Sequence, residues 1–265
     1  MRKRAIGAGA LWVMLAVSIV FLTVPTVAIF ISASPRQLIS AMGDPVAIDA
    51  LKLSFECSLA SLAFVLAVGT PAAWVLARHN FRGKGVVTTL IELPLVLPPA
   101  VAGLGLLAAL GPLGLFGGWL DAVGANLVLE TAGVVVALVF VSAPFHMRQA
   151  QAAFESINPQ LIDAARTLGA GEWRILARIA MPTSAPQLIA GAALAWGRAL
   201  GEFGATLMFA GSLRGVTQTA PLEIYEQFST DLVGAQAVAA VLVAASAAVL
   251  LTSKFFAPRR PAADG

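Results

Sequence analysis

Two charged residues inside an apolar run, Arg198 and Glu202, are the side chains in this sequence best placed to act on a charged molecule. Residues four apart on a helix lie one turn apart on the same face, so the two can form an ion pair. If the run crosses a membrane, charges near its middle are costly and must face protein or water. We therefore expect the pair along a translocation path or at a dimer seam, with a self-neutralised structural ion pair as the alternative.

Small residues and prolines add to this candidate path. Gly197, Gly201 and Ala205 repeat every four residues, and on one helix this spacing lets a second helix approach closely. In another apolar run Pro98 and Pro99 are adjacent, and each lacks the backbone N–H that a helix needs, so a break or kink is expected there. A kinked helix could form the wall of a gate; ordinary packing is the alternative.

The residues that enzymes use are not grouped in this chain. Cys57 is the single cysteine, which excludes an internal disulfide and a cysteine-based zinc cluster. The two histidines, His79 and His146, have no spacing typical of a metal site. The sequence holds no GxxxxGK[ST], HExxH or GxSxG motif. We expect no catalytic residue, metal or cofactor here, so ATP and Mg²⁺ would be bound by a partner.

The composition is that of a membrane protein. Of 265 residues, 58% are hydrophobic and 12% are charged, which is unusual for a soluble domain of this length. A helix needs ~20 mostly apolar residues to cross ~30 Å of hydrocarbon. Runs of this kind cover 8–31, 54–76, 86–110, 127–145, 187–211 and 232–252. We predict an all-α, polytopic membrane protein with about six transmembrane helices in contact with lipid.

The first run follows Arg2, Lys3 and Arg4 and so resembles a signal peptide. Its apolar stretch is longer than the ~7 to 15 residues of such peptides, and we expect a retained span. A cleaved leader that ends near Ser32 to Ser34 is the alternative.

Basic residues predict how the chain is oriented. Of the 17 Lys and Arg residues, 13 lie in segments on the N-terminal side of the membrane, and three, Arg36, Lys52 and Arg214, lie in the opposite loops. Lys and Arg in short loops stay in the cytoplasm. Residues 1–7, 146–185 and 253–265 are therefore expected in the cytoplasm and the spans in the plasma (inner) membrane. This topology accounts for the net charge of +3 without a nucleic-acid partner.

The segment 146–185 is too long for a plain connector and should be folded. Asn158 followed by Pro159 predicts a helix start, and Gly169 a left-handed stop. A second helix should begin near Glu172 and end at Pro182. The expected apolar faces are Leu161, Ala164, Ala165 and Leu168 on the first helix, and Trp173, Leu176, Ala177 and Ala180 on the second. Two short helices joined by a glycine turn form a knob that could fill a groove, or merely cap the membrane bundle.

This segment resembles the cytoplasmic loop of the permease subunits of bacterial ABC importers. The pattern of that loop is EAA, three residues, Gly, nine residues and I-x-L-P. Asp163-Ala164-Ala165, Gly169, Ile179 and Pro182 fall in register with it, with Asp in place of Glu and Met181 in place of Leu. The resemblance implies a type I permease fold and a loop that couples to an ATPase, with Trp173 on its second helix.

A narrower resemblance, to the molybdate permease family within the oxyanion group, covers most of the chain from the third span onward. Its four blocks are "PLVLPPAVAGLGLL" at 94–107, "AARTLGAGEWR" at 164–174, "GRALGEFGATLMFAG" at 197–211 and "TQTAPLEIY" at 217–225. Sulfate and thiosulfate permeases are similar through the first three blocks. The resemblance therefore implies import of molybdate, with sulfate, thiosulfate or tungstate as alternatives.

Such importers also imply partners. These are a second copy of this chain, two cytoplasmic ATPase subunits and an extracytoplasmic binding protein that delivers the anion. The outer loop 212–230 is a candidate surface for the binding protein, through Arg214, Thr217, Gln218 and Tyr225, and a solvated connector is the alternative. A stand-alone secondary transporter would leave the cytoplasmic knob without a role and would more often show repeated halves. A membrane enzyme is the weaker rival.

Overall fold

The fold is described from a computed structural model that places residues 2–255, with side chains described for residues 11–253. All regular secondary structure in this range is helical, which confirms the predicted all-α class. Met1 and the part of the predicted tail at 256–265, with Arg259 and Arg260, lie outside the described residues.

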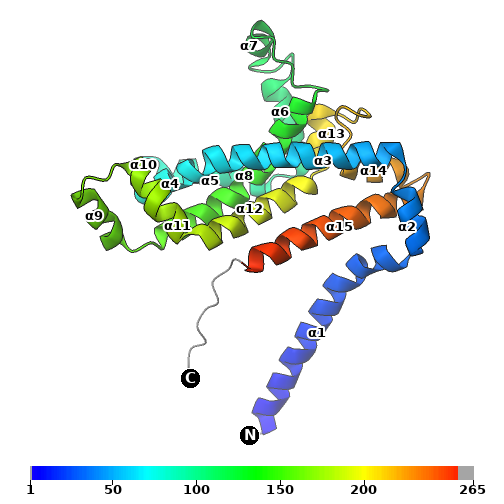
Figure 1. Ribbon diagram of the computed structural model, residues 1–265, viewed down its shortest axis with the longest axis horizontal. Coiled ribbons are helices and arrows are strands. Elements are labelled where there is room, and N and C mark those ends of the chain that lie inside the picture. The colour runs from blue at the N-terminus through cyan, green and yellow to red at the C-terminus, as the bar shows by residue number, and fades with distance from the viewer. Residues whose placement is uncertain (1, 256–265) are drawn as a thin grey trace.

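A bundle of long helices makes up the body of the molecule (Figure 1). Its members are α3 (Pro45–Phe64), α4 (Thr70–Arg78), α8 (Thr131–Glu155), α12 (Ala185–Leu200) and α15 (Leu232–Phe255). Helix α8 lies at the centre, because it packs against α3, α4 and α12. Leu53, Cys57, Val134 and Leu138 are buried where α3 meets α8.

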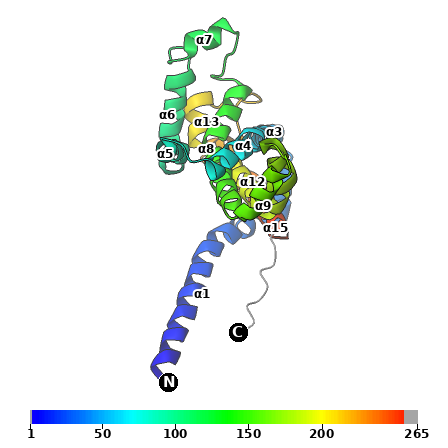
Figure 2. The same ribbon diagram turned by 90° about the vertical axis from the view of Figure 1, so that its left-hand side faces the viewer.

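The helix α1 (Arg2–Ile31) leaves this bundle and contacts α15. None of the residues in its apolar stretch, Leu11–Ile31, is buried within the chain. In Figures 1 and 2 it lies on the side opposite to α6 and α7. The short helix α2 (Pro35–Ala41) follows, and its N-terminus is capped by Ser34 and Gln37. A helix with a fully exposed apolar surface must be covered by lipid or by another protein chain.

Four helical segments in the described part of the chain are long and apolar enough to cross a membrane. They are Leu11–Ile31, Pro45–Arg78, Thr131–Glu155 and Leu232–Ser253, and they correspond to the first, second, fourth and sixth predicted spans. The second begins nine residues earlier than predicted and stays helical to Arg78 through a π-helical turn, η1 (Val65–Gly69). Pro71 cannot donate a backbone hydrogen bond, which favours such an irregular turn just before it.

The third predicted span is two helices, α5 (Lys84–Val96) and α6 (Pro99–Leu110). The break falls at Leu97 and Pro98, as the adjacent prolines predicted. Leu97 has an extended backbone, the conformation that a following proline imposes. Helix α6 runs in a different direction from the bundle helices and leads to the short helix α7 (Gly117–Ala122) (Figure 2).

The fifth predicted span is also broken, and here the prediction of one continuous helix was wrong. Helix α12 ends at Leu200, and α13 (Gly204–Ala210) begins after a three-residue gap. The Glu202 carboxylate accepts a hydrogen bond from the Ala205 backbone N–H, 2.7 Å away. A side chain that satisfies a free N–H group at the start of α13 stabilises a new helix start in place of a continuous one.

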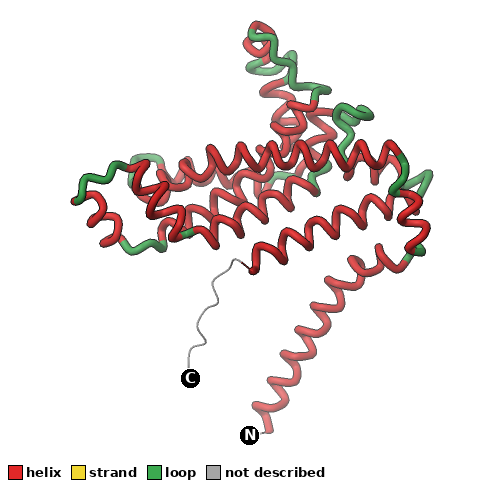
Figure 3. The backbone as a smooth tube through the Cα atoms, viewed as in Figure 1, coloured by secondary structure: helices red, strands yellow, loops and turns green. Residues whose placement is uncertain are grey.

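The remaining helices lie at the two ends of the bundle, and the loops gather at these ends and around α7 (Figure 3). One end carries α9 (Pro159–Thr167), α10 (Glu172–Ile175), a second π-helical turn η2 (Leu176–Ala180) and α11 (Met181–Thr183). The other end carries α2 and α14 (Ala220–Gln227), so the loop 212–230 is partly helical and is not a plain connector. The predicted separate segment 146–185 is shorter in the structure, because α8 continues to Glu155.

Candidate functional site

The best-defined candidate site is the pair of short helices at one end of the bundle, residues 158–183, which we name the coupling loop after the role that the sequence resemblance implies for it. Its local signals are where the sequence predicted them. The Asn158 side chain accepts a hydrogen bond from the Gln160 N–H at 2.9 Å, with Pro159 in the first turn. Gly169 has a φ of +78°, the left-handed conformation expected at a helix C-terminus. Glu172 lies in the first turn of α10.

The side of the coupling loop that packs on the bundle agrees only in part with the predicted apolar faces: Ala165, Leu176 and Ala180 are buried as predicted. Ile162 and Ala165 of α9 are buried against α8, together with Ile175 from α10 and Leu176 and Ala180 from η2. The predicted face residues Leu161, Ala164, Leu168, Trp173 and Ala177 are exposed instead.

The reason is that these helices carry apolar residues on two sides. Local spacing does not decide which side the bundle covers. As a result, Leu168 and Trp173 keep 87% and 72% of their surface exposed. Of the predicted coupling residues, Ala165 and Ile179 pack inward, while Asp163, Ala164, Gly169, Trp173 and Pro182 face outward.

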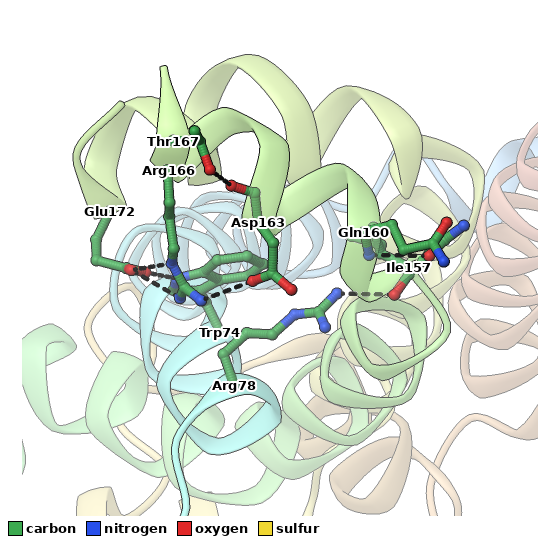
Figure 4. Close-up of polar contacts among 9 residues, drawn as sticks. Trp74, Arg78, Ile157, Gln160, Asp163, Arg166, Thr167 and Glu172 are labelled. Atoms are coloured by element: carbon green, nitrogen blue, oxygen red, sulfur yellow. Dashed lines mark hydrogen bonds and ion pairs between the residues drawn. The ribbon is translucent and has the colours of Figure 1, made fainter. Parts of the chain in front are cut away.

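Charged side chains join the two helices of the coupling loop to each other (Figure 4). The Arg166 guanidinium donates two hydrogen bonds to Glu172 Oε1, from Nε at 3.2 Å and from Nη2 at 2.9 Å. Arg166 Nη1 also lies 3.6 Å from Asp163 Oδ1. Asp163 therefore has an ion-pair partner within the loop itself, and the sequence did not predict it.

The environment of Glu172 shifts its titration. Partial burial raises the pKa of this carboxyl, but the hydrogen bonds that Arg166 and Trp74 donate lower it by more. The net pKa lies below its ordinary value of 4.5. Glu172 is thus held ionised by its partners, and the link between α9 and α10 persists at neutral pH.

Two residues outside the loop, Trp74 and Arg78 on α4, complete this polar cluster, and sequence reasoning missed both. Trp74 Nε1 donates a hydrogen bond to Glu172 Oε2 at 3.2 Å. Arg78 Nη2 donates to the backbone oxygens of Phe154 and Ile157. In the sequence, a Trp and an Arg near the end of a span are typical of any membrane interface. No signal there pointed to a contact 98 residues away.

The charged pair forms as predicted, but its setting differs. Arg198 Nη2 lies 2.6 Å from Glu202 Oε2. Glu202 is only 1% exposed and lies beyond the end of α12, where it also accepts the Ala205 N–H. The pair therefore lies at the break between α12 and α13.

The small-residue stripe at Gly197, Gly201 and Ala205 does not form, because α12 ends before Gly201. A Cβ atom placed on Gly197 would meet no other atom within 4 Å. Close helix approach occurs instead between α6 and α13. A Cβ atom on Gly103 would lie 2.7 Å from the Ala205 oxygen, and one on Gly204 would lie 2.8 Å from Cβ of Pro99. The break at Pro98 and Pro99 thus packs against the break in the fifth span.

The outer-loop residues divide into two pairs. Thr217 and Gln218 are buried, so their side chains do not lie on the surface expected for a binding-protein contact. Thr217 Oγ1 accepts the Leu213 N–H at 2.8 Å, and Gln218 donates to Glu226. Arg214 and Tyr225 are exposed. Thr217 and Gln218 were mistaken for surface residues because polar side chains in a short loop are usually solvated.

Comparison with known proteins identifies the family to which this chain belongs. Residues 69–260 match the family described as binding-protein-dependent transport system inner membrane component. The chain belongs to this family. This inner membrane component is a multi-pass membrane protein, and it is a permease subunit of the ABC transporter family. The predicted family resemblance is confirmed.

Named relatives and solved structures agree. The chain is 42% identical to the molybdenum transport system permease protein ModB of Mycobacterium tuberculosis over 88% of each chain. It is 34% identical to the sulfate transport system permease protein CysW of Synechocystis sp., over 89% of this chain and 87% of that one.

Among solved structures, a bacterial ABC transporter involved in alginate import is similar at a TM-score of 0.74 and 20% identity, over 93% of this chain and 94% of that one. The MetNI methionine ABC transporter is similar at a TM-score of 0.62 and 17% identity, over 79% and 94%. The fold is therefore that of the type I ABC permeases.

Proposed function

We propose that this permease is the translocation subunit of an ATP-driven importer of molybdate. The observation that carries the substrate is the relationship itself. Identity to a molybdenum permease is 42%, against 34% to a sulfate permease over a similar share of the chain. Tungstate and sulfate, anions of the same shape and charge, are the alternatives. The block 217–225, which distinguished the molybdate group, begins with buried residues that hold the loop. We therefore use it as evidence of sequence similarity to molybdate permeases, and not as a contact with the anion.

The assembly that fits this function is a homodimer of the permease with two ATPase subunits and an extracytoplasmic binding protein. ATP and Mg²⁺ would be bound by the ATPase subunits. The bias of basic residues supports a cytoplasmic position for the coupling loop and for both termini. Arg214 and Tyr225, which are exposed in the loop 212–230, are the residues we assign to the binding-protein contact.

The coupling loop has two sides with different tasks. Ile162, Ala165 and Ile175 hold it to α8 and α4. Leu161, Leu168 and Trp173 leave apolar surface exposed beside the charged Asp163. Tryptophan is enriched among the residues that carry most of the binding energy near the centre of protein interfaces. We assign this outward side to a groove on the ATPase, so that closure of the ATPase pair moves the loop and the helices behind it.

The translocation path is assigned to α6 and α13. Both helices follow a break in a span, and they pack together away from the direction of the bundle (Figures 1 and 2). The Arg198 to Glu202 pair lies at one of these breaks and fixes the start of α13. Because Glu202 cancels most of the field of Arg198, we assign the pair to the geometry of the path and not to anion binding.

The test is uptake of labelled molybdate by membrane vesicles that contain the permease, its ATPase and the binding protein. Uptake should require ATP, and excess sulfate should compete poorly. Uptake without ATP, or equal competition by sulfate, would contradict the proposal. Competition by tungstate measures how well the importer distinguishes molybdate from tungstate.

A matched pair of variants tests the docking side. Trp173→Ala should weaken binding of the ATPase by ~30-fold, since interface tryptophans contribute about 2 kcal/mol or more. Trp119→Ala is the control, because Trp119 is 66% exposed on α7, far from the coupling loop. Binding is measured by titration of the ATPase onto the detergent-solubilised permease. Equal affinities for the two variants would remove Trp173 from the interface.

A further inference from the structure

The end of α4 contacts the chain at two places: at the entrance to the coupling loop, and in the middle of the loop at the start of α10. Arg78 Nη2 donates hydrogen bonds to the oxygen of Phe154, 2.7 Å away in the last turn of α8, and to the oxygen of Ile157, 3.1 Å away just before α9. The last carbonyl groups of a helix have no partner within the helix and attract cationic donors. Arg78 therefore fixes the direction in which the chain leaves α8.

Trp74, one turn earlier on α4, holds the middle of the loop. Its indole N–H reaches Glu172 at the start of α10, at 3.2 Å. Its ring packs edge-on against Phe154, with centroids 5.4 Å apart, and the Arg78 guanidinium lies 5.4 Å from its centroid. Three interactions thus depend on one side chain, which is 3% exposed. Figure 4 shows Trp74 and Arg78 pointing from α4 toward the loop.

Helix α4 continues a long helical segment. Residues Pro45–Arg78 form one stretch of 34 residues that crosses the bundle. A displacement of Arg78 therefore moves the second span as well. The coupling loop is already connected through the chain to α8 at one end and through α11 to α12 at the other. The link to α4 is different because it depends only on side chains.

We propose that Trp74 and Arg78 are positioning residues that lock the coupling loop to the second span, so that a movement imposed on the loop by the ATPase reaches α3 and α4 together with α8 and α12. The inference rests on the proposed coupling function. Neither residue contacts ATP or the transported anion in this assignment. They act by keeping the loop at a fixed angle to the bundle.

This link between α4 and the coupling loop, which we name the lock (Trp74 and Arg78), can be tested on the permease alone. Spin labels at Asn80→Cys and Leu168→Cys, in a Cys57→Ser background, report the distance between the end of α4 and the turn of the coupling loop. All three natural residues lie outside the lock. Trp74→Phe removes the indole N–H and keeps an aromatic ring, and Arg78→Gln removes the charge. Both should broaden the distance distribution, whereas Arg82→Gln, an exposed residue in the following loop, should leave it unchanged. Unchanged distributions in both lock variants would overturn the inference.

The functional test measures ATP hydrolysed per molybdate taken up, in vesicles that contain the complete importer. In Arg78→Gln this ratio should rise by about tenfold, because the charged hydrogen bonds of Arg78 are lost. ATP hydrolysis then continues, but fewer molybdate ions are taken up for each ATP. Arg78→Lys keeps the charge but not the flat guanidinium over Trp74, and should fall between this variant and the wild type. Arg82→Gln should match the wild type.

The outcomes separate the two proposals. If the wild-type complex takes up no molybdate, the proposed function fails, while the spin-label result still decides the lock. If Arg78→Gln does not fold, Trp74→Phe and Arg78→Lys carry the test, with folding checked by size-exclusion chromatography. A ratio within twofold of the wild type in every lock variant that folds would overturn the inference.

Discussion

A single added methyl group on α6 tests the packing that defines the broken spans. In the structure a Cβ atom on Gly103 would lie 2.7 Å from the Ala205 oxygen, 2.7 Å from Cβ of Met208 and 3.0 Å from the Ala205 Cα. Ordinary contacts begin near 3.4 Å, so two of the three distances are about 0.7 Å too short. Two of these atoms belong to the backbone of α13, which cannot move aside as a flexible side chain can.

Gly105, two residues further along α6, provides a matched control. A Cβ atom there would meet nothing within 4 Å. Replacing a helical glycine by alanine normally stabilises a helix by ~0.5 to 1 kcal/mol. That gain is common to both positions, and overpacking costs ~1 to 3 kcal/mol at Gly103 alone. The difference in stability between Gly103→Ala and Gly105→Ala should therefore be ~1 to 3 kcal/mol.

The assay is thermal unfolding of the purified variants in the same detergent, followed by molybdate uptake. Gly103→Ala should melt below the wild type and transport less, because α6 and α13 are pushed apart. Gly105→Ala should melt at or above it. If the two variants melt together, α6 and α13 do not pack through Gly103, and the assignment of these helices to the path loses its support.

Two further predictions concern the coupling loop and the outer loop. Gly169→Val should impair ATP-driven uptake, because a φ of +78° costs an L residue roughly 1 to 2 kcal/mol, whereas Gly171→Val, at a φ of −74°, should not; equal uptake by both would exclude a role for the turn. Burial raises the pKa of Glu223 above 4.5, although a hydrogen bond from Gln227 opposes this, so the folded state binds the proton more tightly than the unfolded state. The stability that this carboxyl contributes is present below its unfolded pKa and is lost as the pH rises through the higher folded value. Glu223→Gln should therefore raise the melting temperature more at about pH 8 than at about pH 5, and a shift that is equal at both values would contradict this.

The sequence determined the features that depend on a short stretch of chain and its solvent. The length of each apolar run predicted a membrane protein, since the thickness of hydrocarbon sets the number of residues needed. Asn158, Pro159 and Gly169 predicted the ends of α9, because caps and left-handed turns depend on the backbone of a few residues. Pro98 and Pro99 predicted the break before α6 for the same reason.

Tertiary structure alone decided which surfaces face each other. The coupling loop packs through Ile162 and Ile175 and leaves Leu168 and Trp173 outside, although all four are apolar and lie on short helices or at the end of one. Glu202 lies in the break between α12 and α13, where its carboxylate accepts the Ala205 N–H and pairs with Arg198. The contact between Trp74 and Glu172 joins residues 98 positions apart. The spacing of residues along a helix predicts which side chains share a face. Which of these side chains are buried or paired depends on the neighbours that the whole fold brings to the helix.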